Sequence, residues 1–283
     1  MPQRNCICIC FLTLILSLSR AEASSPVLEG LAGAGRSGIP EASIFLNPAA
    51  IGILQNAISF FNYSKTRIND FNAGGKDYSL GIYDTTNTFA HAGFAYERES
   101  RATVTNNGAQ GYADNSKLRF GLARELADGL IAGVTPRYVI NKSPSGDTKF
   151  FTGDAGIIFN LAADMRAGIT YENASQQVGE RPPTLAGGLN YGLGFGVGLY
   201  GDYGSAMQGP LKNNKLWSLG AELAMFSDIV LRGGLYRDAI IGQRGAALGL
   251  SWAGPRLGLD FAMKTTYYAP IERDVSFGLV IKM

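Results

Sequence analysis

Residues 255–264 read Pro-Arg-Leu-Gly-Leu-Asp-Phe-Ala-Met-Lys, in which large apolar side chains alternate with polar or small ones. Successive side chains of a β-strand point to opposite faces, so this order gives a strand one aliphatic face and one polar face. Residues 164–172 and 228–238 repeat the alternation, with Ile169 and Leu231 on the apolar rows. The period of two therefore predicts β-strands with one face in an apolar environment.

Two kinds of connection alternate between these runs. Short turn signals such as Ala127-Asp-Gly129 and Ala162-Ala-Asp164 alternate with longer polar stretches such as 99–116, 142–149 and 204–214. A membrane barrel carries tight turns on one side and longer loops on the other, whereas alternation alone also fits a soluble sandwich. Counting the runs gives about 14 strands, an even number that places both chain ends on the periplasmic side.

The predicted fold class is therefore all-β, a transmembrane antiparallel β-barrel formed by residues 55–283. After the first twenty residues the sequence contains no apolar run as long as the roughly 18 residues that a membrane helix needs. The expected location is the outer membrane of a Gram-negative-type cell, with membrane lipid as a partner.

Residues 1–23 have the form of a secretory signal peptide. Arg4 precedes a mostly apolar run over 7–18, and Ala21-Glu-Ala23 has the small-x-small form of a cleavage site. All three cysteines of the chain lie in this segment, so the mature chain is expected to have no disulfide and no thiol chemistry.

Residues 24–54 differ in kind, because glycine, alanine and other small residues replace the strand alternation. We expect this segment to form a plug inside the barrel, since glycine lets backbones pack closely in a narrow lumen. The run from Gly33 through Gly35 to Gly38 matches the G-x-G-x-x-G motif, but no strand precedes it and no βαβ unit follows it. We therefore predict no dinucleotide site and no cofactor.

A family resemblance enters at this segment. Gly33-Ala-Gly35, followed by Ala42-Ser43 and by Asn47-Pro48-Ala49, resembles the N-terminal hatch signature of FadL-type hydrocarbon transporters and of the related PorV- and PorQ-like outer-membrane proteins. The resemblance implies a fourteen-stranded barrel with an N-terminal hatch, in which Asn47, Pro48 and Ala49 kink the plug. The chain is shorter than typical FadL members, which affects the outer loops rather than the barrel.

The resemblance leaves more than one function open. A FadL-like barrel would be a passive channel for small hydrophobic molecules, whereas a PorV- or PorQ-like barrel would be a scaffold or shuttle that binds envelope proteins. The connections 99–116 and 204–214 are polar, which argues against an apolar binding site for fatty acids at the outer mouth and indicates no particular protein partner. A general porin is disfavoured, because a plug conflicts with a wide open pore.

The alternation also predicts which polar side chains point into the lumen. A charge there is more often a structural ion pair than a determinant of selectivity. The lumen-lining candidates are His91, Arg119, Arg137, Asp154, Arg166, Glu172, Glu222, Arg232 and Asp260.

Catalysis, metal binding and nucleic-acid binding have little support in the sequence. His91 is the single histidine, and no compact set of serine, histidine and carboxylate is visible, so we predict no enzyme activity and no catalytic residue. One histidine without a mature cysteine does not make a typical transition-metal site. The net charge of +2 gives no electrostatic basis for nucleic-acid binding.

Overall fold

The computed structural model describes residues 25–68, 74–87, 89–104, 110–143, 146–175, 181–208, 214–226, 228–267 and 271–283. The predicted signal peptide lies outside these residues. Fourteen antiparallel strands form a closed barrel in which each strand pairs with its neighbours in the chain. The strands are β1 (Ile58–Ile68), β2 (Gly74–Asp84), β3 (His91–Val104), β4 (Gln110–Ala127), β5 (Leu130–Ser143), β6 (Gly146–Ala162), β7 (Met165–Glu172), β8 (Thr184–Gly194), β9 (Val197–Ala206), β10 (Lys215–Met225), β11 (Ile229–Asp238), β12 (Gln243–Ala253), β13 (Leu257–Thr266) and β14 (Glu272–Lys282).

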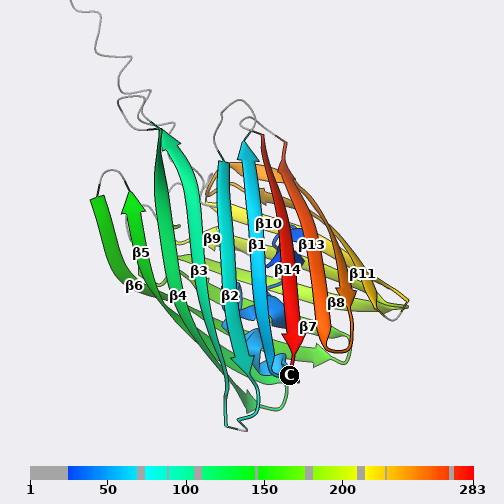
Figure 1. Ribbon diagram of the computed structural model, residues 1–283. Helices are drawn as coiled ribbons and strands as arrows, with labels where there is room; N and C mark the ends of the chain where they lie inside the picture. Colours follow the sequence, from blue (N-terminus) through cyan, green and yellow to red (C-terminus); the bar gives the residue numbers. More distant parts are fainter. Residues whose placement is uncertain are drawn as a thin grey trace, which may run out of the picture.

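The first and last strands close the barrel. Strand β1 pairs with β14 along its whole length, from Ile58 opposite Lys282 to Ile68 opposite Glu272. The two strands lie side by side in Figure 1, where the chain ends at the lower rim. The predicted all-β barrel of fourteen strands is confirmed.

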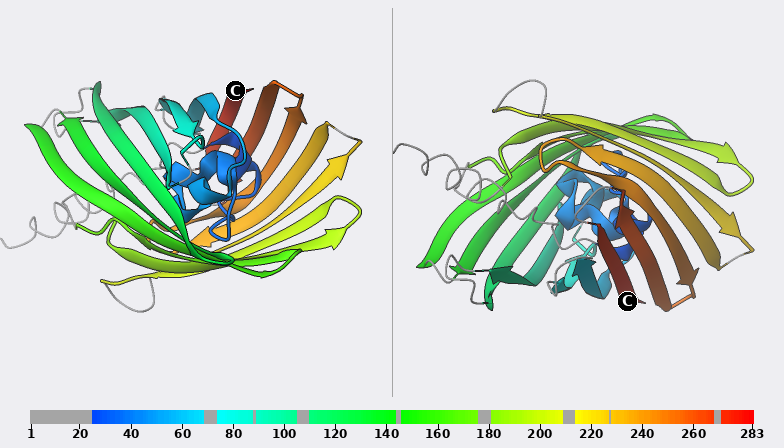
Figure 2. Two further views of the ribbon diagram at one scale, coloured as in Figure 1. Left: turned by 90° about the horizontal axis from the view of Figure 1, so that it is seen from below. Right: turned by 90° about the horizontal axis from the view of Figure 1, so that it is seen from above.

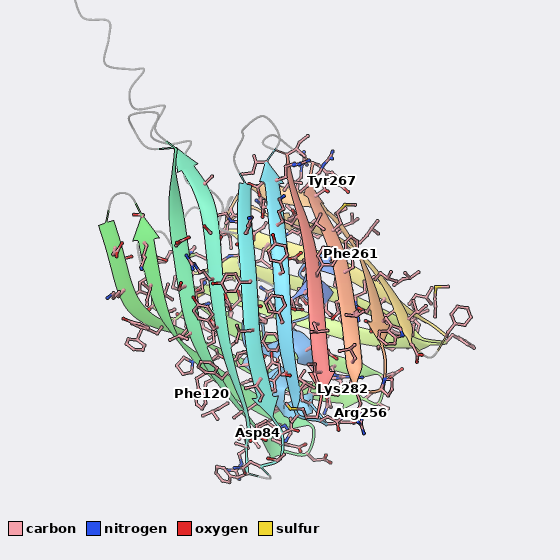
Figure 3. All side chains as sticks on the ribbon, viewed as in Figure 1. Asp84, Phe120, Arg256, Phe261, Tyr267 and Lys282 are labelled. Atoms are coloured by element: carbon pink, nitrogen blue, oxygen red, sulfur yellow. The ribbon has the colours of Figure 1, made fainter. Side chains whose placement is uncertain are left out.

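The outer face of the barrel is apolar. Large aliphatic and aromatic side chains on alternate strand positions are exposed, and Figure 3 shows side chains projecting outward along the whole wall. On β13 the exposed row is Leu257, Leu259, Phe261 and Met263, as the alternation predicts. In water such a surface would be costly, whereas in a bilayer it faces lipid.

Two connections are shorter than the sequence predicts. Over 142–149 we expected a polar loop, but β5 continues to Ser143 and β6 begins at Gly146. Over 99–116 the paired strands β3 and β4 likewise extend far into the polar stretch. Backbone pairing does not require apolar side chains, and a polar strand extension in water can add ion pairs such as Arg98 Nη2 to Asp114 Oδ2 at 2.9 Å.

Three short helical segments fill the inside of the barrel, shown in blue in both views of Figure 2. They are the helix α2 (Pro26–Gly30) and the 3-10 helices η1 (Pro40–Phe45) and η2 (Pro48–Ile53). Ser25 caps α2 through its side chain, and proline is the first residue of each segment, a position where the missing N–H has no cost. The expected short N-terminal plug is therefore present.

The plug packs against the wall as part of one core. Leu31, Ile44 and Ile51 of the plug are at most 1% exposed and pack with wall residues that include Tyr83 and Ile158. Helix α2 contacts β11 to β14, whereas η2 contacts β3 to β6, so the segment crosses the lumen. None of the helices in the described ranges has the length and apolarity of a membrane span.

The depth of the lipid-facing wall can be tested on β13. Phe261 lies near the middle of the barrel height, whereas Tyr267 lies near one end (Figure 3). Both side chains are exposed on the outer side, at 39% and 56%. Phe261→Lys should cost about 2–4 kcal/mol of folding free energy in lipid vesicles, and Tyr267→Lys only about 0–1 kcal/mol. Equal losses in urea-unfolding titrations of the two variants would contradict a lipid belt at this height.

Candidate functional site: the plug, its wall contacts and two cavities

Glycines on the inner wall let the plug approach the strands closely. A Cβ atom at Gly133 would lie 2.5 Å from the backbone nitrogen of Ala49, and one at Gly234 would lie 2.7 Å from the carbonyl oxygen of Leu31. Several of these glycines face each other across neighbouring strands. The pairs are Gly93 with Gly121, Gly133 with Gly156, Gly168 with Gly188 and Gly220 with Gly234. The wall is therefore shaped to the backbone of the plug.

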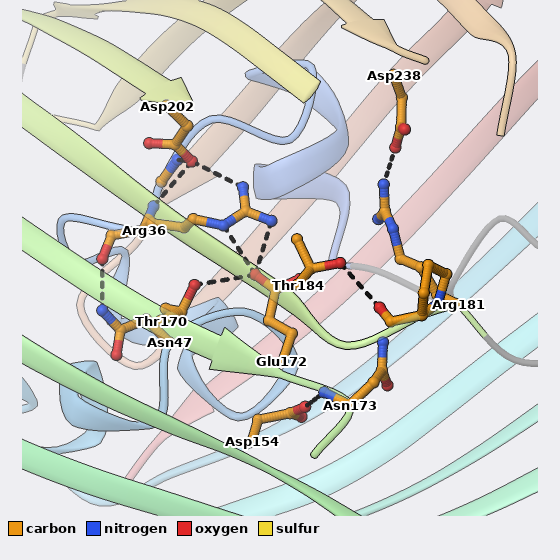
Figure 4. A network of polar contacts seen from close by, with 12 residues as sticks. Arg36, Asn47, Asp154, Thr170, Glu172, Asn173, Arg181, Thr184, Asp202 and Asp238 are labelled. Carbon is orange, nitrogen blue, oxygen red and sulfur yellow. Dashed lines mark hydrogen bonds and ion pairs between the residues drawn. The ribbon is translucent and has the colours of Figure 1, made fainter. Parts of the chain in front are cut away.

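Arg36 is the main polar anchor of the plug (Figure 4). Its side chain is buried, and its Nη2 lies 2.7 Å from Glu172 Oε1 on β7 while its Nη1 lies 3.1 Å from Asp202 Oδ2 on β9. The backbone N–H of Gly35 and that of Arg36 also donate to Asp202, at 2.9 and 3.1 Å. Burial opposes the charge of Arg36, but Glu172 and Asp202 outweigh it and hold its pKa above the usual value.

The Asn47-Pro48-Ala49 motif connects this anchor to η2. The Asn47 side chain accepts from the N–H of Ala49 at 3.1 Å, which caps η2, and its Nδ2 donates to the carbonyl oxygen of Arg36 at 2.5 Å. Pro48 is the first residue of η2. Gly33 and Gly35 have positive φ values of 82° and 156°, which allow the backbone to turn just before Arg36. The role of these residues as a transport hatch stays a prediction.

A second buried charge cluster lies beside the first, on β3 to β6. Arg119 pairs with Glu97, and its Nη1 lies 3.3 Å from Asp154 Oδ2. Arg137 Nη2 lies 3.6 Å from Asp154 Oδ1 and also donates to Asn173. These groups are all at most 8% exposed. The Arg119 guanidinium also stacks over the Phe45 ring of the plug, 5.6 Å from its centroid.

A third cluster faces α2 and the turns. Arg232 Nε lies 3.4 Å from Glu222 Oε2, and its Nη1 lies 4.0 Å from Asp260 Oδ1. The hydroxyl group of Tyr200 donates to Glu222 at 2.6 Å. Most predicted lumen charges thus lie in inward-facing ion pairs, and their part in selectivity stays a prediction.

His91 and Arg166 are the two predicted lumen residues outside these clusters. His91 Nδ1 lies 3.2 Å from the carbonyl oxygen of Ile51 in the plug. Arg166 is half-buried and lines a cavity beside Gly38. Within the described residues, no group of three or more potential ligands has an arrangement that could hold a metal ion.

Two cavities lie on opposite sides of the plug. The first, of about 140 Å³, is on the side of the longer connections and is called the loop-side pocket. Its lining combines the apolar side chains Leu28, Ala32, Phe45, Leu46, Leu216 and Ile241 with the charged side chains Glu29, Arg36, Arg181, Arg237, Asp238 and Lys264. The second, of about 480 Å³, is on the side of the tight turns and is called the turn-side cavity. The plug residues Val27, Ile39, Ile53 and Leu54 line it together with Arg166, Tyr200, Glu222, Arg232 and Lys282.

The charges of both cavities are mostly partnered. In the loop-side pocket Arg181 pairs with Asp238, and Lys264 Nζ lies 4.4 Å from the centroid of the Tyr236 ring. In the turn-side cavity, burial raises the pKa of Glu41 in the plug above its usual value.

Sequence reasoning missed two residues of this site, namely Arg36 and Asp202. Asp202 alternates inward like the residues that were named, so the strand pattern could have found it. Arg36 belongs to the plug, where no periodicity indicates the direction of a side chain. Its position directly after Gly35 was the available signal, since the N–H groups of both residues donate to Asp202.

No protein-family model matches the chain, and the search of curated proteins found no match. Solved structures do share its fold. The CymD monoaromatic hydrocarbon channel has a TM-score of 0.74 at 14% identity, covering 92% of this chain and 97% of that one. The Ralstonia pickettii toluene transporter TbuX has a TM-score of 0.71 at 15% identity, covering 92% and 98%. A Pseudomonas aeruginosa FadL homologue has a TM-score of 0.69 at 12% identity, covering 91% and 98%.

These TM-scores establish a common fold, so the predicted FadL-type barrel is confirmed as an architecture. The first two of these proteins are a channel and a transporter rather than enzymes. The likeness to PorV- and PorQ-like proteins stays a prediction.

The anchoring role of Arg36 can be tested by substitution. Arg36→Met leaves the buried carboxylates of Glu172 and Asp202 without their cation, which should cost about 3–5 kcal/mol. Limited proteolysis of the folded barrel should then cut within 25–54 at protease concentrations that spare the native plug. Arg98→Met removes a cation from the exposed pair with Asp114 and should leave cleavage unchanged. A plug equally resistant in both variants would rule out Arg36 as its anchor.

The fit of the plug to wall glycines can be tested separately. A Cβ at Gly168 would fall on the carbonyl oxygen of Arg36, whereas one at Gly258 would meet no atom closer than 3.5 Å. We expect Gly168→Ala to destabilise the protein by about 1–3 kcal/mol, since backbone must move, and Gly258→Ala to cost less. Urea titrations of the refolded variants measure the difference, and similar midpoints would contradict a tight seat for the plug.

Proposed function

We propose that this protein is a passive outer-membrane channel for small hydrophobic molecules, with both chain ends in the periplasm. The fold is shared with the monoaromatic hydrocarbon channel CymD and the toluene transporter TbuX. The apolar outer wall supports residence in a bilayer, and the tight turns at the rim that carries the C-terminus support a periplasmic position for that rim. The segment 24–54 would be the hatch of this channel.

The loop-side pocket is the observation that carries the proposal. Most of its apolar side chains come from the plug and from β10, and Ile241 comes from the connection between β11 and β12. Its volume of about 140 Å³ is close to that of an apolar protein cavity, about 150 Å³, that can hold a benzene ring. A molecule of the size of a single aromatic ring therefore fits this pocket better than a long acyl chain.

The electrostatics of the lumen disfavour an anionic solute. Arg119 and Arg137 balance the charges of Glu97 and Asp154. Arg36 and Arg232 each lie beside two carboxylates, so these two clusters carry a small negative surplus. The plug separates the two cavities, which disfavours free flow of water and ions. A small rearrangement of the plug would connect the cavities without an energy source.

The scaffold alternative, with envelope proteins as partners, remains a prediction from the hatch motif. Neither the pocket nor the compared structures favours it. The transport proposal is the one that accounts for a pocket with apolar side chains inside a plugged barrel.

Filling the loop-side pocket should block the route. Leu216 is 5% exposed and lines the pocket, whereas Leu219 on the same strand is 56% exposed and faces outward. Leu216→Trp should lower the uptake of radiolabelled toluene by cells that carry the protein in their outer membrane at least about tenfold, because a filled cavity leaves no room for a ligand. Leu219→Trp makes the same substitution on the lipid side and should leave uptake unchanged.

Both variants must first show heat-modifiable migration in electrophoresis, which verifies a closed barrel. If Leu216→Trp folds and transports toluene like the unchanged protein, the loop-side pocket is not on the route.

A further inference from the structure

Two neighbouring turns at the C-terminal rim carry fully exposed apolar side chains. Phe195 is 100% exposed and Phe226 is 86% exposed, beside Leu193 at 52% and Met225 at 37%. These four residues are called the aromatic rim. Large apolar side chains at the tips of turns gain nothing from the folded barrel itself, so their presence requires another explanation.

The two turns form one continuous patch. Phe195 lies between β8 and β9, Phe226 lies between β10 and β11, and β9 pairs with β10. The backbone N–H of Ala224 donates to the carbonyl oxygen of Gly196 at 2.7 Å, which joins the ends of the two turns. The aromatic rim is therefore a single surface.

The backbone conformation of these turns favours other residues. Phe195 and Phe226 have positive φ values of 52° and 56°, in the left-handed region that glycine and asparagine adopt more readily. Two other turns of the same rim, after β4 and after β6, carry the polar residues Asp128 and Asp164. A phenylalanine in such a conformation indicates that its exposed ring is used.

The rim merges with the lipid-facing wall. On the strands next to the turns, the outward side chains Leu189, Leu199 and Leu219 are exposed, and the run 182–201 contains no charged residue. The opposite part of the rim differs, since Asp84, Arg256 and Lys282 lie at the ends of β2, β13 and β14 (Figure 3). A protein-docking patch usually has a polar border, whereas this one continues into the apolar belt.

We propose that the aromatic rim inserts into the lipid leaflet on the turn side of the barrel. Aromatic rings suit the boundary between headgroups and acyl chains, and the unbroken apolar surface leads from the membrane-spanning wall to the rings. The proposal goes beyond the proposed function and does not depend on transport.

Insertion has a consequence for the turn-side cavity. Ala224 and Val230 line this cavity and flank the turn that carries Phe226. A rim held in lipid keeps this edge of the cavity against the leaflet rather than in bulk water. A hydrophobic molecule in the cavity would then have a short path into lipid.

Single-cysteine variants test the insertion, because the three native cysteines lie within residues 1–23 and can be left out of a refolded chain. Phe195→Cys, Phe226→Cys and the matched turn-tip control Asp128→Cys are labelled with an environment-sensitive dye. The barrels are then reconstituted into phosphatidylcholine vesicles. Quenching by nitroxide-labelled lipid should be at least severalfold stronger at 195 and 226 than at 128. Quenching by aqueous iodide, present on both sides of the membrane, should follow the reverse order.

A second label removes the objection that the dye itself drives insertion. Leu193→Cys is labelled with Phe195 and Phe226 intact and again in the Phe195→Ser, Phe226→Ser background. The polar background should reduce lipid quenching severalfold while heat-modifiable migration persists. Equal lipid quenching at 128, 195 and 226 would overturn the proposal. A second outcome would also overturn it, namely strong iodide quenching in pure lipid vesicles together with weak iodide quenching in native outer membranes. That result would mean that a protein, rather than lipid, covers the rim. Failure of toluene uptake alone would leave these results unchanged.

Discussion

The pairing of β1 with β14 satisfies the backbone groups that the first and last strands would otherwise leave open. In hydrocarbon no water is available for an unpaired N–H or C=O group, so a sheet can cross a bilayer only when it has no edge. Closure divides the side chains of every strand into an outer row that meets lipid and an inner row that meets the lumen. The apolar wall, the buried charges and the space for a plug all follow from that division.

The lumen of the barrel is filled by the plug rather than by the strands alone. The barrel is too wide for its own side chains to fill, and the inward rows hold both glycines and charges. The plug fits where the glycines leave room, and it supplies Arg36 to two carboxylates that lie on β7 and β9. Buried ion pairs contribute little net stability, but removing one partner is costly, so this arrangement specifies where the plug sits. Position, rather than strength, is what these pairs provide.

The two cavities derive their character from the same construction. Because the plug contributes Leu28, Phe45 and Leu46 to one cavity and Ile53 and Leu54 to the other, it presents apolar side chains on both sides, next to polar groups such as Arg36 and Glu41. Small hydrophobic solutes and a plugged barrel are therefore compatible in one structure. The aromatic rim extends this surface to the membrane at the turn side, where Phe195 and Phe226 project from adjoining turns.

The sequence by itself determined the strands, their number and the direction of their side chains. The period of two at Leu257, Leu259 and Phe261 follows from the geometry of an extended chain alone. The pattern is clear in the sequence because the side chains of this row, which face lipid, are apolar. The polar ends of β5 and β6 were predicted to be a loop, because strands that pair in water need no row of apolar side chains. Tertiary structure alone decided the partners of Arg36 and the two cavities, since these depend on strands that are far apart in the chain. A local pattern records which face a residue occupies, but not which residue lies across the lumen.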